Sequence, residues 1–248
     1  MSNKNLINAK RAKNDEFYTQ YSDIEKELKH YQRHLKNKIV YCNCNDTQSN
    51  FSRYFLINFK ALRLKKLITT NGDFRSNECI ELLKQSDIVV TNPPFSLFRE
   101  YVKQLFEYNK KFVIIGNMNA ITYKEIFPKI KENKLWLGAT GNGSDMVFAV
   151  PNGFEIAESD RQKAARLGYI GNYTRLGNSC WFTNLDHGRR HQPLPLMTME
   201  ENLKYSKHKQ IKGKKAYDTY DNYDAIEVSF TDAIPRDYDG VMGVPISL

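Results

Sequence analysis

Residues 87–98 read DIVVTNPPFSLF, and this stretch decides how the fold is interpreted. A short apolar run, Ile88–Val90, ends in Asn92-Pro93-Pro94-Phe95, and a helical pattern follows it. The run fits a buried strand because it is short, apolar and bounded by turn residues. Two consecutive prolines fix φ and remove two backbone donors, and the residue before a proline is driven towards an extended conformation. The sequence therefore predicts a stiff loop at the carboxyl end of a buried strand.

This loop presents an amide side chain from Asn92, backbone carbonyls and the ring of Phe95. Ligands of open α/β sheets bind outside the carboxyl ends of the strands. The loop is therefore interpreted as a site for a planar group that carries an amine. The alternative is an ordinary turn, since Asn-Pro is a common turn opener. The strand before the loop and the helix after it favour the binding site.

Apolar strands alternate with amphipathic helices over the first half of the chain. A capping box, Ser22-Asp23-Ile24-Glu25, predicts the start of the first helix. The alternation predicts an α/β fold with a mostly parallel, doubly wound sheet that helices cover on both faces. Its strands are expected at Lys38–Asn43, Lys66–Thr69, Ile88–Thr91 and Lys111–Gly116.

The pattern changes after about residue 133. Shorter strands are expected at Leu135–Leu137, Val147–Val150 and Cys180–Phe182, separated by loops rich in glycine and asparagine. A basic, turn-rich stretch then occupies residues 186–215. The second half is therefore expected to add a few strands to the sheet and to end in a smaller, basic region.

Composition limits the class of protein. The 248 residues are 41% hydrophobic, enough for one large α/β domain with a smaller appendage. No apolar run approaches the about 18 residues of a membrane span, and the first residues do not resemble a signal peptide. A cytoplasmic protein is expected. The net charge of +9 suits a polyanionic partner, although many basic proteins bind none.

No metal site is expected. Cys42 and Cys44 are too close for the usual C-x-x-C zinc spacing, and no second pair of ligands follows. The five histidines are scattered among polar residues, which is typical of surface positions.

The proline loop resembles the (Asn/Asp/Ser)-Pro-Pro-(Tyr/Phe) motif of amino-methyltransferases, which use S-adenosylmethionine. The resemblance implies a catalytic role for Asn92, Pro93, Pro94 and Phe95. The side-chain carbonyl of Asn92 and the backbone carbonyl of Pro93 would accept hydrogen bonds from the target amine. Phe95 would stack on the ring that carries this amine.

Three further segments resemble cofactor-binding segments of adenine methyltransferases. Phe17-Tyr18-Thr19 resembles the segment that lines the methionine part of the cofactor, and the alternative is a simple entry to the first helix. Asp73-Phe74 resembles the pair that holds the cofactor's adenine, and the alternative is a Gly-Asp turn. The turn after the first strand lacks the usual glycines, and Asp46 there either contacts the cofactor or caps the next helix. The implied cofactor-binding residues are Phe17, Tyr18, Thr19, Cys42, Asn43, Asp46, Asp73 and Phe74.

Segments along nearly the whole chain resemble the EcoRI-type adenine-specific DNA methyltransferases. They include KNDEFYTQYSDIEKELKHY, IVYCNCNDTQSNF, DIVVTNPPFSLFREYV, CWFTNLDH and IPRDYDGVMGVPI. The resemblance implies a Rossmann-like methyltransferase fold, S-adenosylmethionine as donor, adenine N6 as acceptor and a place in a restriction–modification or phage system. Residues 1–135 would form the S-adenosylmethionine-binding and catalytic domain. Residues 136–248 would hold the remaining strands and a DNA-recognition region.

Double-stranded DNA is the implied partner, with neither a membrane nor a metal, and the chain is expected to act as a monomer. The target adenine would have to flip out of the duplex. Phosphate contacts are expected from Arg189, Arg190, Lys207, Lys209 and Lys212, and the alternative for these residues is a solvated loop.

Two other functions stay open at this point. The passage from Ile68 to Gly72 is abrupt, whereas the family has a longer connection there, and this favours an inactive or weakened DNA-binding homologue. Methyltransferases that act on RNA or on protein glutamine share the Asn-Pro-Pro loop, because a glutamine amide is also a planar amine.

Overall fold

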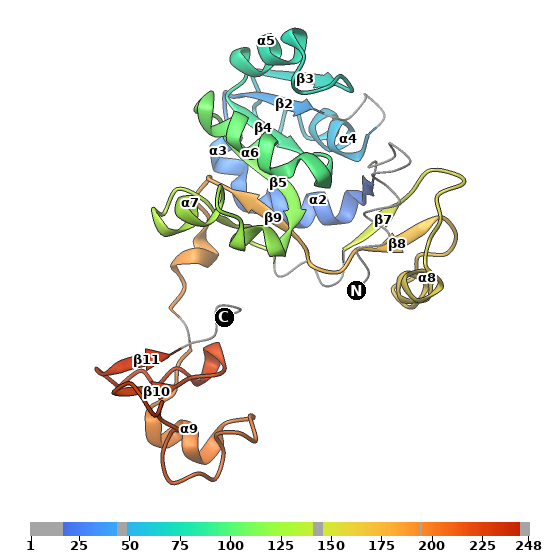
Figure 1. Cartoon of the computed structure of the whole chain (residues 1–248). Helices are drawn as coiled ribbons and strands as arrows, with labels where there is room; N and C mark the ends of the chain where they lie inside the picture. Colours follow the sequence, from blue (N-terminus) through green and yellow to red (C-terminus); the bar gives the residue numbers. More distant parts are fainter. Residues whose placement is uncertain (1–16, 44–48, 141–145, 194, 244–248) are drawn as a thin grey trace. The chain divides into compact units, whose positions relative to one another are not determined.

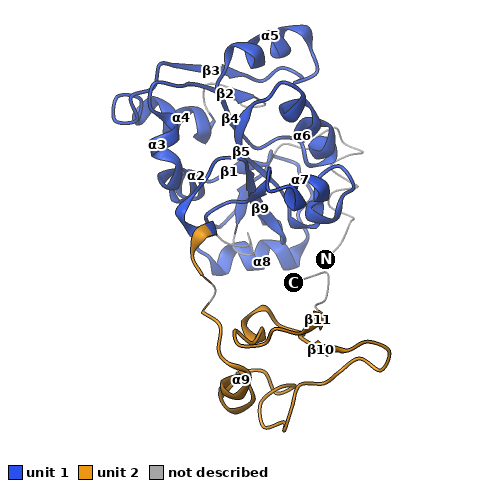
Figure 2. Cartoon of the chain, turned by 90° about the vertical axis from the view of Figure 1, so that its left-hand side faces the viewer, with its two compact units in different colours: residues 1–190 blue, residues 191–248 orange. Residues whose placement is uncertain are grey.

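A computed structural model of the chain describes residues 17–43, 49–140, 146–193 and 195–243 (Figure 1). The chain divides into two compact units, residues 1–190 and residues 191–248 (Figure 2). Each unit is described by itself. The division of function expected between residues 135 and 136 lies inside the first unit and stays a prediction.

A six-stranded sheet forms the centre of the first unit, in the order β3-β2-β4-β5-β9-β6. The first four of these strands are parallel, and β9 lies antiparallel to both β5 and β6. The α/β fold with a mostly parallel sheet, predicted from the alternating pattern, is confirmed. The strands are β2 (Ile39–Asn43), β3 (Lys66–Thr70), β4 (Ile88–Thr91), β5 (Lys111–Asn117), β6 (Trp136–Leu137) and β9 (Ser179–Thr183).

Helices cover both faces of this sheet (Figure 1). One face packs against α2 and α4, and the other packs against α5, α6 and the segment that leads into α7. The helical segments are α2 (Tyr21–Leu28), η1 (Lys29–Tyr31), α3 (Gln32–Leu35), α4 (Asn50–Ile57), α5 (Asn77–Gln85), η2 (Phe95–Leu97), α6 (Phe98–Glu107), η3 (Met118–Thr122), α7 (Phe127–Lys131) and η4 (Gly188–His191).

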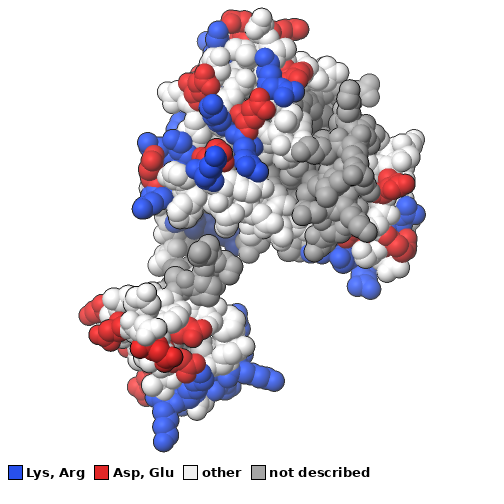
Figure 3. Space-filling view, in the orientation of Figure 1, with Lys and Arg blue, Asp and Glu red and all other residues white. Residues whose placement is uncertain are grey.

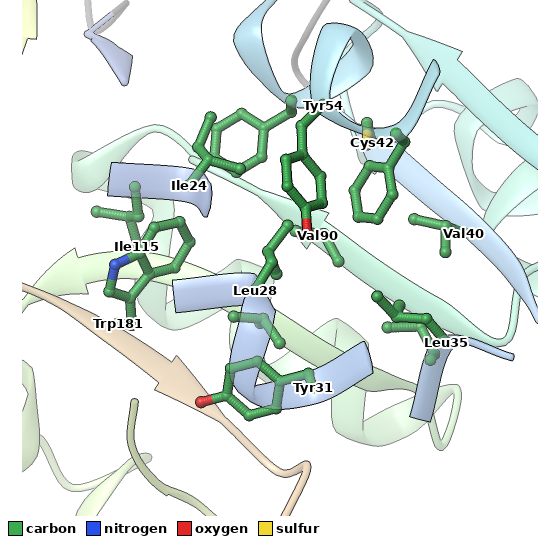
Figure 4. Packing of buried hydrophobic residues seen from close by; sticks show 14 of the residues in the cluster. Ile24, Leu28, Tyr31, Leu35, Val40, Cys42, Tyr54, Val90, Ile115 and Trp181 are labelled. Atoms are coloured by element: carbon green, nitrogen blue, oxygen red, sulfur yellow. The ribbon is translucent and has the colours of Figure 1, made fainter. Parts of the chain in front are cut away.

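The central strands are apolar throughout because both of their faces are buried. Alternate side chains of β4 enter opposite cores: Val90 joins the cluster around α2 and α4, whereas Val89 joins the cluster around α6. In the first cluster, Ile24 and Leu28 of α2 lie against the side chains of the sheet, Trp181 among them (Figure 4). This double burial explains why short apolar runs located the strands correctly.

The first helix does not begin with the predicted capping box. α2 starts at Tyr21, and its N-cap is Gln20, whose side chain makes no capping hydrogen bond. Ser22 therefore lies inside the first turn, and the prediction at Ser22–Glu25 is wrong. A capping box does form in the second unit, where Thr198 and Glu201 bond reciprocally at the start of α9.

The position of β2 defines the topological switch point. From β2 the chain passes to β3 on one side, and then to β4 on the other side. The carboxyl ends of β2 and β4 are therefore adjacent, and the chain leaves them in opposite directions. Such a point is where open α/β sheets bind ligands.

A second, three-stranded sheet has the order β1-β7-β8, with antiparallel neighbours. It consists of β1 (Tyr18–Thr19), β7 (Val147–Ala149) and β8 (Tyr173–Arg175), and α8 (Glu158–Arg166) lies between β7 and β8 in the chain. Thr19, Phe148 and Thr174 face one another across the three strands. The strand expected near Val147 thus exists, but it belongs to this second sheet.

The second unit has its own small core around Ile211, Tyr217 and Val228. It contains α9 (Met199–Tyr205), η5 (Thr231–Ala233) and two parallel strands, β10 (Ala225–Glu227) and β11 (Val241–Gly243). The turn-rich stretch expected over residues 186–215 therefore contains a helix that its polar composition concealed.

Three thiols, those of Cys42, Cys79 and Cys180, are free and buried. Burial raises the pKa of Cys180 to about 12, with a smaller contribution from Glu27. Among the described residues, His, Cys, Asp and Glu side chains form no group of three that could hold a metal. No helix in the described ranges has the length and apolar character that a membrane span requires.

Candidate active site

Asn92 is the first residue after β4, at the switch point. Its Nδ2 donates a hydrogen bond to the backbone carbonyl of Phe17, at 2.7 Å. This bond fixes the orientation of the amide, because a carbonyl can only accept. The Oδ1 atom is buried and has no hydrogen-bond partner among the described residues. A buried acceptor without a donor is costly, so this oxygen can accept a hydrogen bond from a further donor.

The loop after Asn92 is held by hydrogen bonds that involve only some of its carbonyls. The carbonyl of Pro94 accepts from the N–H of Leu97 at 3.0 Å and starts η2. Within the described ranges, no hydrogen bond reaches the carbonyl of Pro93. The loop therefore keeps two acceptors available, the amide oxygen of Asn92 and the carbonyl of Pro93.

Aromatic rings surround this loop. Phe95 lies edge-on to Phe17 and Phe148, with ring centroids 5.8 and 6.4 Å away. Phe17 also contacts Phe148 and Phe154, at 6.1 and 5.5 Å. Edge-on packing at these distances is favourable, and it holds the ring of Phe95 against the main core.

Gly116 of β5 allows α6 to lie close to the sheet. A Cβ atom at this position would come within 2.4 Å of the ring of Phe98, the first residue of α6. β4 is tied to β2 as well, because the hydroxyl of Thr91 donates to the carbonyl of Asn43. The proline loop thus begins and ends on well-anchored residues.

The segment Phe17–Thr19 reaches the switch point, and its expected contact with the cofactor stays a prediction. The carbonyl of Phe17 contacts Asn92, and the carbonyl of Thr19 accepts from Asn50 Nδ2 at 2.8 Å. The hydroxyl of Thr19 is buried without a partner in the described part of the chain. Tyr18 is about half exposed, at 46%.

The residues at the end of β2 are more deeply buried than the segment Phe17–Thr19. Cys42 is fully buried in the core beside α2 and α4, and its role there is packing. Asn43 is buried and donates from Nδ2 to the hydroxyl of Tyr41, at 2.7 Å. Asp46 lies outside the described residues. The helix that follows is capped by Ser49, whose hydroxyl accepts from the N–H of Ser52.

Asp73 and Phe74 follow β3, on the other side of β2. The Asp73 carboxylate accepts from Nη2 and Nε of Arg75, at 2.7 and 3.0 Å. These hydrogen bonds to Arg75 hold the pKa of Asp73 below its usual value. Phe74 is buried and packs edge-on against Tyr101, with ring centroids 4.8 Å apart. Both side chains therefore already have partners within the chain.

The structure divides the expected DNA contacts between the two units. In the first unit, Arg189 donates to the carbonyl of Ala139 at 2.6 Å, and Arg190 stacks over Trp136 at 3.7 Å and pairs with Asp186. In the second unit, Lys207 pairs with Asp232 at 2.7 Å.

Lys209 and Lys212 are exposed, and neither has an ion pair with another described residue. Basic side chains gather on one side of the second unit, over α9 and the turn after it, whereas acidic ones gather near β10 and β11 (Figure 3). These two lysines are therefore free to meet an anion.

Glu27 is a buried supporting residue that the sequence did not reveal. It is fully buried in α2 and accepts from the N–H groups of Ala139 and Thr140, at 2.8 and 2.7 Å, and from Tyr31 at 2.6 Å. It therefore fixes the segment whose carbonyl holds Arg189. A glutamate in an amphipathic helix is typical of a solvated face, so only the long-range contact identifies its role.

The sequence was compared with protein-family models and with curated proteins. A family model described as adenine-specific methyltransferase EcoRI matches residues 5–71 and 68–248. The chain is 45% identical to the type II methyltransferase M.EcoRI of Escherichia coli, over 99% of this chain and 85% of that protein. It is 40% identical to the type II methyltransferase M.MpnI of Mycoplasma pneumoniae, over 96% of this chain and 79% of that protein.

The break in the family match falls at residues 68–71, the end of β3, where the abrupt connection was noted. The alignment with M.EcoRI has 291 positions and this chain has 248 residues, so at least 43 positions (291 − 248) have no counterpart here. Most of the family's length is nevertheless covered, including the proline loop and the segments around it. The chain belongs to the EcoRI family of adenine-specific DNA methyltransferases.

Proposed function

We propose that this enzyme transfers a methyl group from S-adenosylmethionine to the N6 amine of an adenine that has flipped out of a specific double-stranded DNA sequence. The observation that carries the proposal is the Oδ1 of Asn92 at the switch point, which is buried and has no hydrogen-bond partner among the residues that the structure describes. The names of the related type II methyltransferases support a place in a restriction–modification or phage system.

Asn92 and the carbonyl of Pro93 would accept hydrogen bonds from the two N–H groups of the adenine amine. The lone pair of this nitrogen is delocalised into the ring, so acceptors that favour a tetrahedral nitrogen lower the barrier. Phe95 would contact the base ring. The donor would supply an electrophilic methyl carbon: the nitrogen–carbon bond would form as the sulfur–carbon bond breaks, and one N6 proton would pass to solvent. Holding both reactants in line is the main task of the chain.

The donor would lie over the carboxyl ends of β2 and β3. The free hydroxyl of Thr19 and the adjacent backbone of Phe17 and Asn43 offer polar groups for its methionine part. Asp73 would accept from its adenine amine once it leaves Arg75. Cys42 would support this surface from within the core.

DNA would be held mainly through phosphates. Arg189, Lys209 and Lys212 have donors available for such contacts. Arg190 and Lys207 would first exchange a contact within the chain for a phosphate. Such contacts position the duplex without reading its sequence. They would offset the few kcal/mol that flipping an adenine costs.

The test is transfer of labelled methyl groups from S-adenosylmethionine to unmethylated DNA by the wild type and by Asn92→Ala. We expect label in N6-methyladenine, reduced by about 10²- to 10³-fold in the variant, as for other groups that stabilise a transition state. The matched control is Asn58→Ala, because Asn58 also donates from Nδ2 to a backbone carbonyl, that of Tyr54. This control should keep full activity.

The two alternatives give different results. DNA binding without measurable affinity for S-adenosylmethionine would identify an inactive DNA-binding homologue. Label found on RNA or on protein glutamine, and absent from DNA, would reject the DNA substrate.

A further inference from the structure

An exposed apolar side chain stands at the tip of the segment between α8 and β8. Ile170 is 85% exposed, the highest value among the large hydrophobic residues in the described part of the chain. The tip belongs to the first unit, and the strand that follows it is part of the three-stranded sheet (Figure 1). An isoleucine in this position gains nothing from the fold of the chain itself.

The backbone of the tip is ordered by specific hydrogen bonds. The N–H of Gly168 donates to Ala165 and the N–H of Tyr169 donates to Ala164, both at 3.0 Å, which is the pattern of a Schellman helix end. Gly168 and Gly171 have φ of +90° and +108°, values that other residues rarely adopt. Ile170 is therefore held outward by a defined turn between two glycines.

Aromatic contacts stiffen the base of this turn. The rings of Tyr169 and Tyr173 pack against each other across it, with centroids 5.3 Å apart. The N–H of Tyr173 also donates to the carbonyl of Gly171, at 2.9 Å. The tip is thus a rigid projection, suited to pushing a side chain into another molecule.

The sheet connects the tip to the proline loop. Thr174 of β8 faces Phe148 of β7, which contacts Phe95. Ile170 precedes Thr174 by four residues, so it lies at most about 14 Å away along the chain. Adjacent strands are about 4.8 Å apart. The rings of Phe148 and Phe95 are a further 6.4 Å apart, so Ile170 lies within about 25 Å of the proline loop, where the flipped adenine is proposed to bind.

The segment that carries the tip is basic, and the acidic residues of α8, Glu158 and Asp160, lie in its first turn, at the opposite end of the helix from the tip. No acidic residue occurs between Asp160 and Asp186, and this stretch carries Arg161, Lys163, Arg166 and Arg175. Lys163 pairs with Asp160, at the far end of α8 from the tip. An apolar side chain beside cations is the combination by which proteins insert into the base stack and hold the adjacent phosphates.

We propose that Ile170 is a wedge that enters the DNA base stack when the target adenine leaves it. The inference rests on the proposed function, since only a flipped base leaves a gap to fill. The side chain makes no hydrogen bond, so it reads no sequence. It acts as a positioning residue that makes extrusion of a paired base less costly.

The test compares Ile170→Ala with the wild type on two duplexes that carry the enzyme's site, identified beforehand as the sequence that the wild type binds in a pool of random duplexes. In one duplex the target adenine is paired with thymine, and in the other it is mismatched and already easy to extrude. We expect the variant to lose about tenfold or more in kcat/KM on the paired duplex and less than about threefold on the mismatched one. Ile57→Ala is the matched control, because Ile57 on α4 is also exposed, at 62%, and should show no such difference.

A second readout separates the wedge from methyl transfer. With 2-aminopurine in place of the target adenine, the wild type should increase the fluorescence on binding, and Ile170→Ala should increase it much less. Equal fluorescence with both proteins, or an equal loss of kcat/KM on both duplexes, would overturn the wedge. Absence of methyl transfer by the wild type, with the fluorescence difference intact, would instead reject the proposed function and leave the wedge standing.

Discussion

Two loops leave the sheet on either side of β2, and they differ in how much of their hydrogen-bonding capacity is already used. The loop after β4 keeps the Oδ1 of Asn92 buried and unpartnered within the described residues. The loop after β3 has its carboxylate, that of Asp73, bonded to Arg75 two residues further on. The first loop is therefore ready for a donor, whereas the second must exchange one partner for another.

The difference follows from local sequence. The two prolines after Asn92 have no N–H group to donate to its Oδ1, and the hydrogen bond from its side chain to Phe17 uses only its amino group. After β3, Arg75 follows Asp73 by two residues and pairs with its carboxylate at 2.7 Å. The family match is interrupted at the same point. We infer that the loop after β4, proposed to bind the target amine, already has its binding conformation. The loop after β3, proposed to bind the cofactor's adenine, would reach its binding conformation only when the cofactor binds.

The largest effect that tests this comparison is expected from Asn92→Asp. A carboxylate keeps an acceptor but cannot donate to the carbonyl of Phe17, and the two oxygens would repel each other. Losing that bond should cost about 1–3 kcal/mol and should release the segment Phe17–Thr19. S-adenosylmethionine affinity, measured by equilibrium binding, should therefore fall about five- to 100-fold. Unchanged affinity would show that the bond to Phe17 is no part of the cofactor site.

An intermediate effect is expected from Gly116→Ala, which disturbs only the preformed loop. The added methyl group would contact the ring of Phe98 and displace the start of α6. Overpacking of this kind costs about 1–3 kcal/mol, which denaturant unfolding will measure. Gly188→Ala is the control, since a Cβ there meets nothing within 4 Å. If methyl transfer kept its full rate despite the lost stability, the exact position of the loop would not matter.

The smallest effect is expected from Arg75→Gln, which frees the occupied loop. The pKa of Asp73, followed by carboxylate NMR, should rise towards its ordinary value, because the side-chain hydrogen bonds from Arg75 are its main cause of lowering and only the backbone N–H of residue 75 still donates. Because folding lowers the pKa of Asp73, the Asp73–Arg75 ion pair stabilises the fold at pH values above the ordinary pKa of aspartate. This stabilisation is lost as the pH falls through the pKa that Asp73 has in the folded protein.

The same variant should bind S-adenosylmethionine up to about fivefold more tightly, because no ion pair has to be broken first. Asp73→Asn should weaken binding. Weaker binding by Arg75→Gln would mean that Arg75 prepares Asp73 for the cofactor.

The amino-acid sequence was sufficient to predict the parts of the fold that are buried on both sides. β4 coincides with the predicted run Ile88–Thr91, because parallel central strands are continuous apolar segments. α8 and α9 were missed because their surfaces are polar, and β1 is only two residues long. Helices and strands that are stabilised mainly by tertiary contacts cannot be recognised from the composition of their own segments.

For the site, the proline motif located Asn92, but its partner could not be found from spacing. Phe17 and Asn92 are 75 residues apart, and only the resemblance placed both at one site. Glu27 was invisible for the same reason, since its partners at 139–140 lie 112 and 113 residues away. The occupied state of Asp73 depends on the rotamer of Arg75, which a sequence does not specify.

The buried thiol of Cys42 can be used to measure how often the sheet opens. The thiol of Cys42 lies inside the strand that defines the switch point, and burial raises its pKa far above the usual range. The thiolate is the reactive form of cysteine. Cys42 should therefore not react with alkylating reagents while β2 is hydrogen-bonded to its neighbouring strands. Its rate of modification therefore reports how often the centre of the binding edge opens. Ligands that close that edge should slow the modification without touching the sulfur.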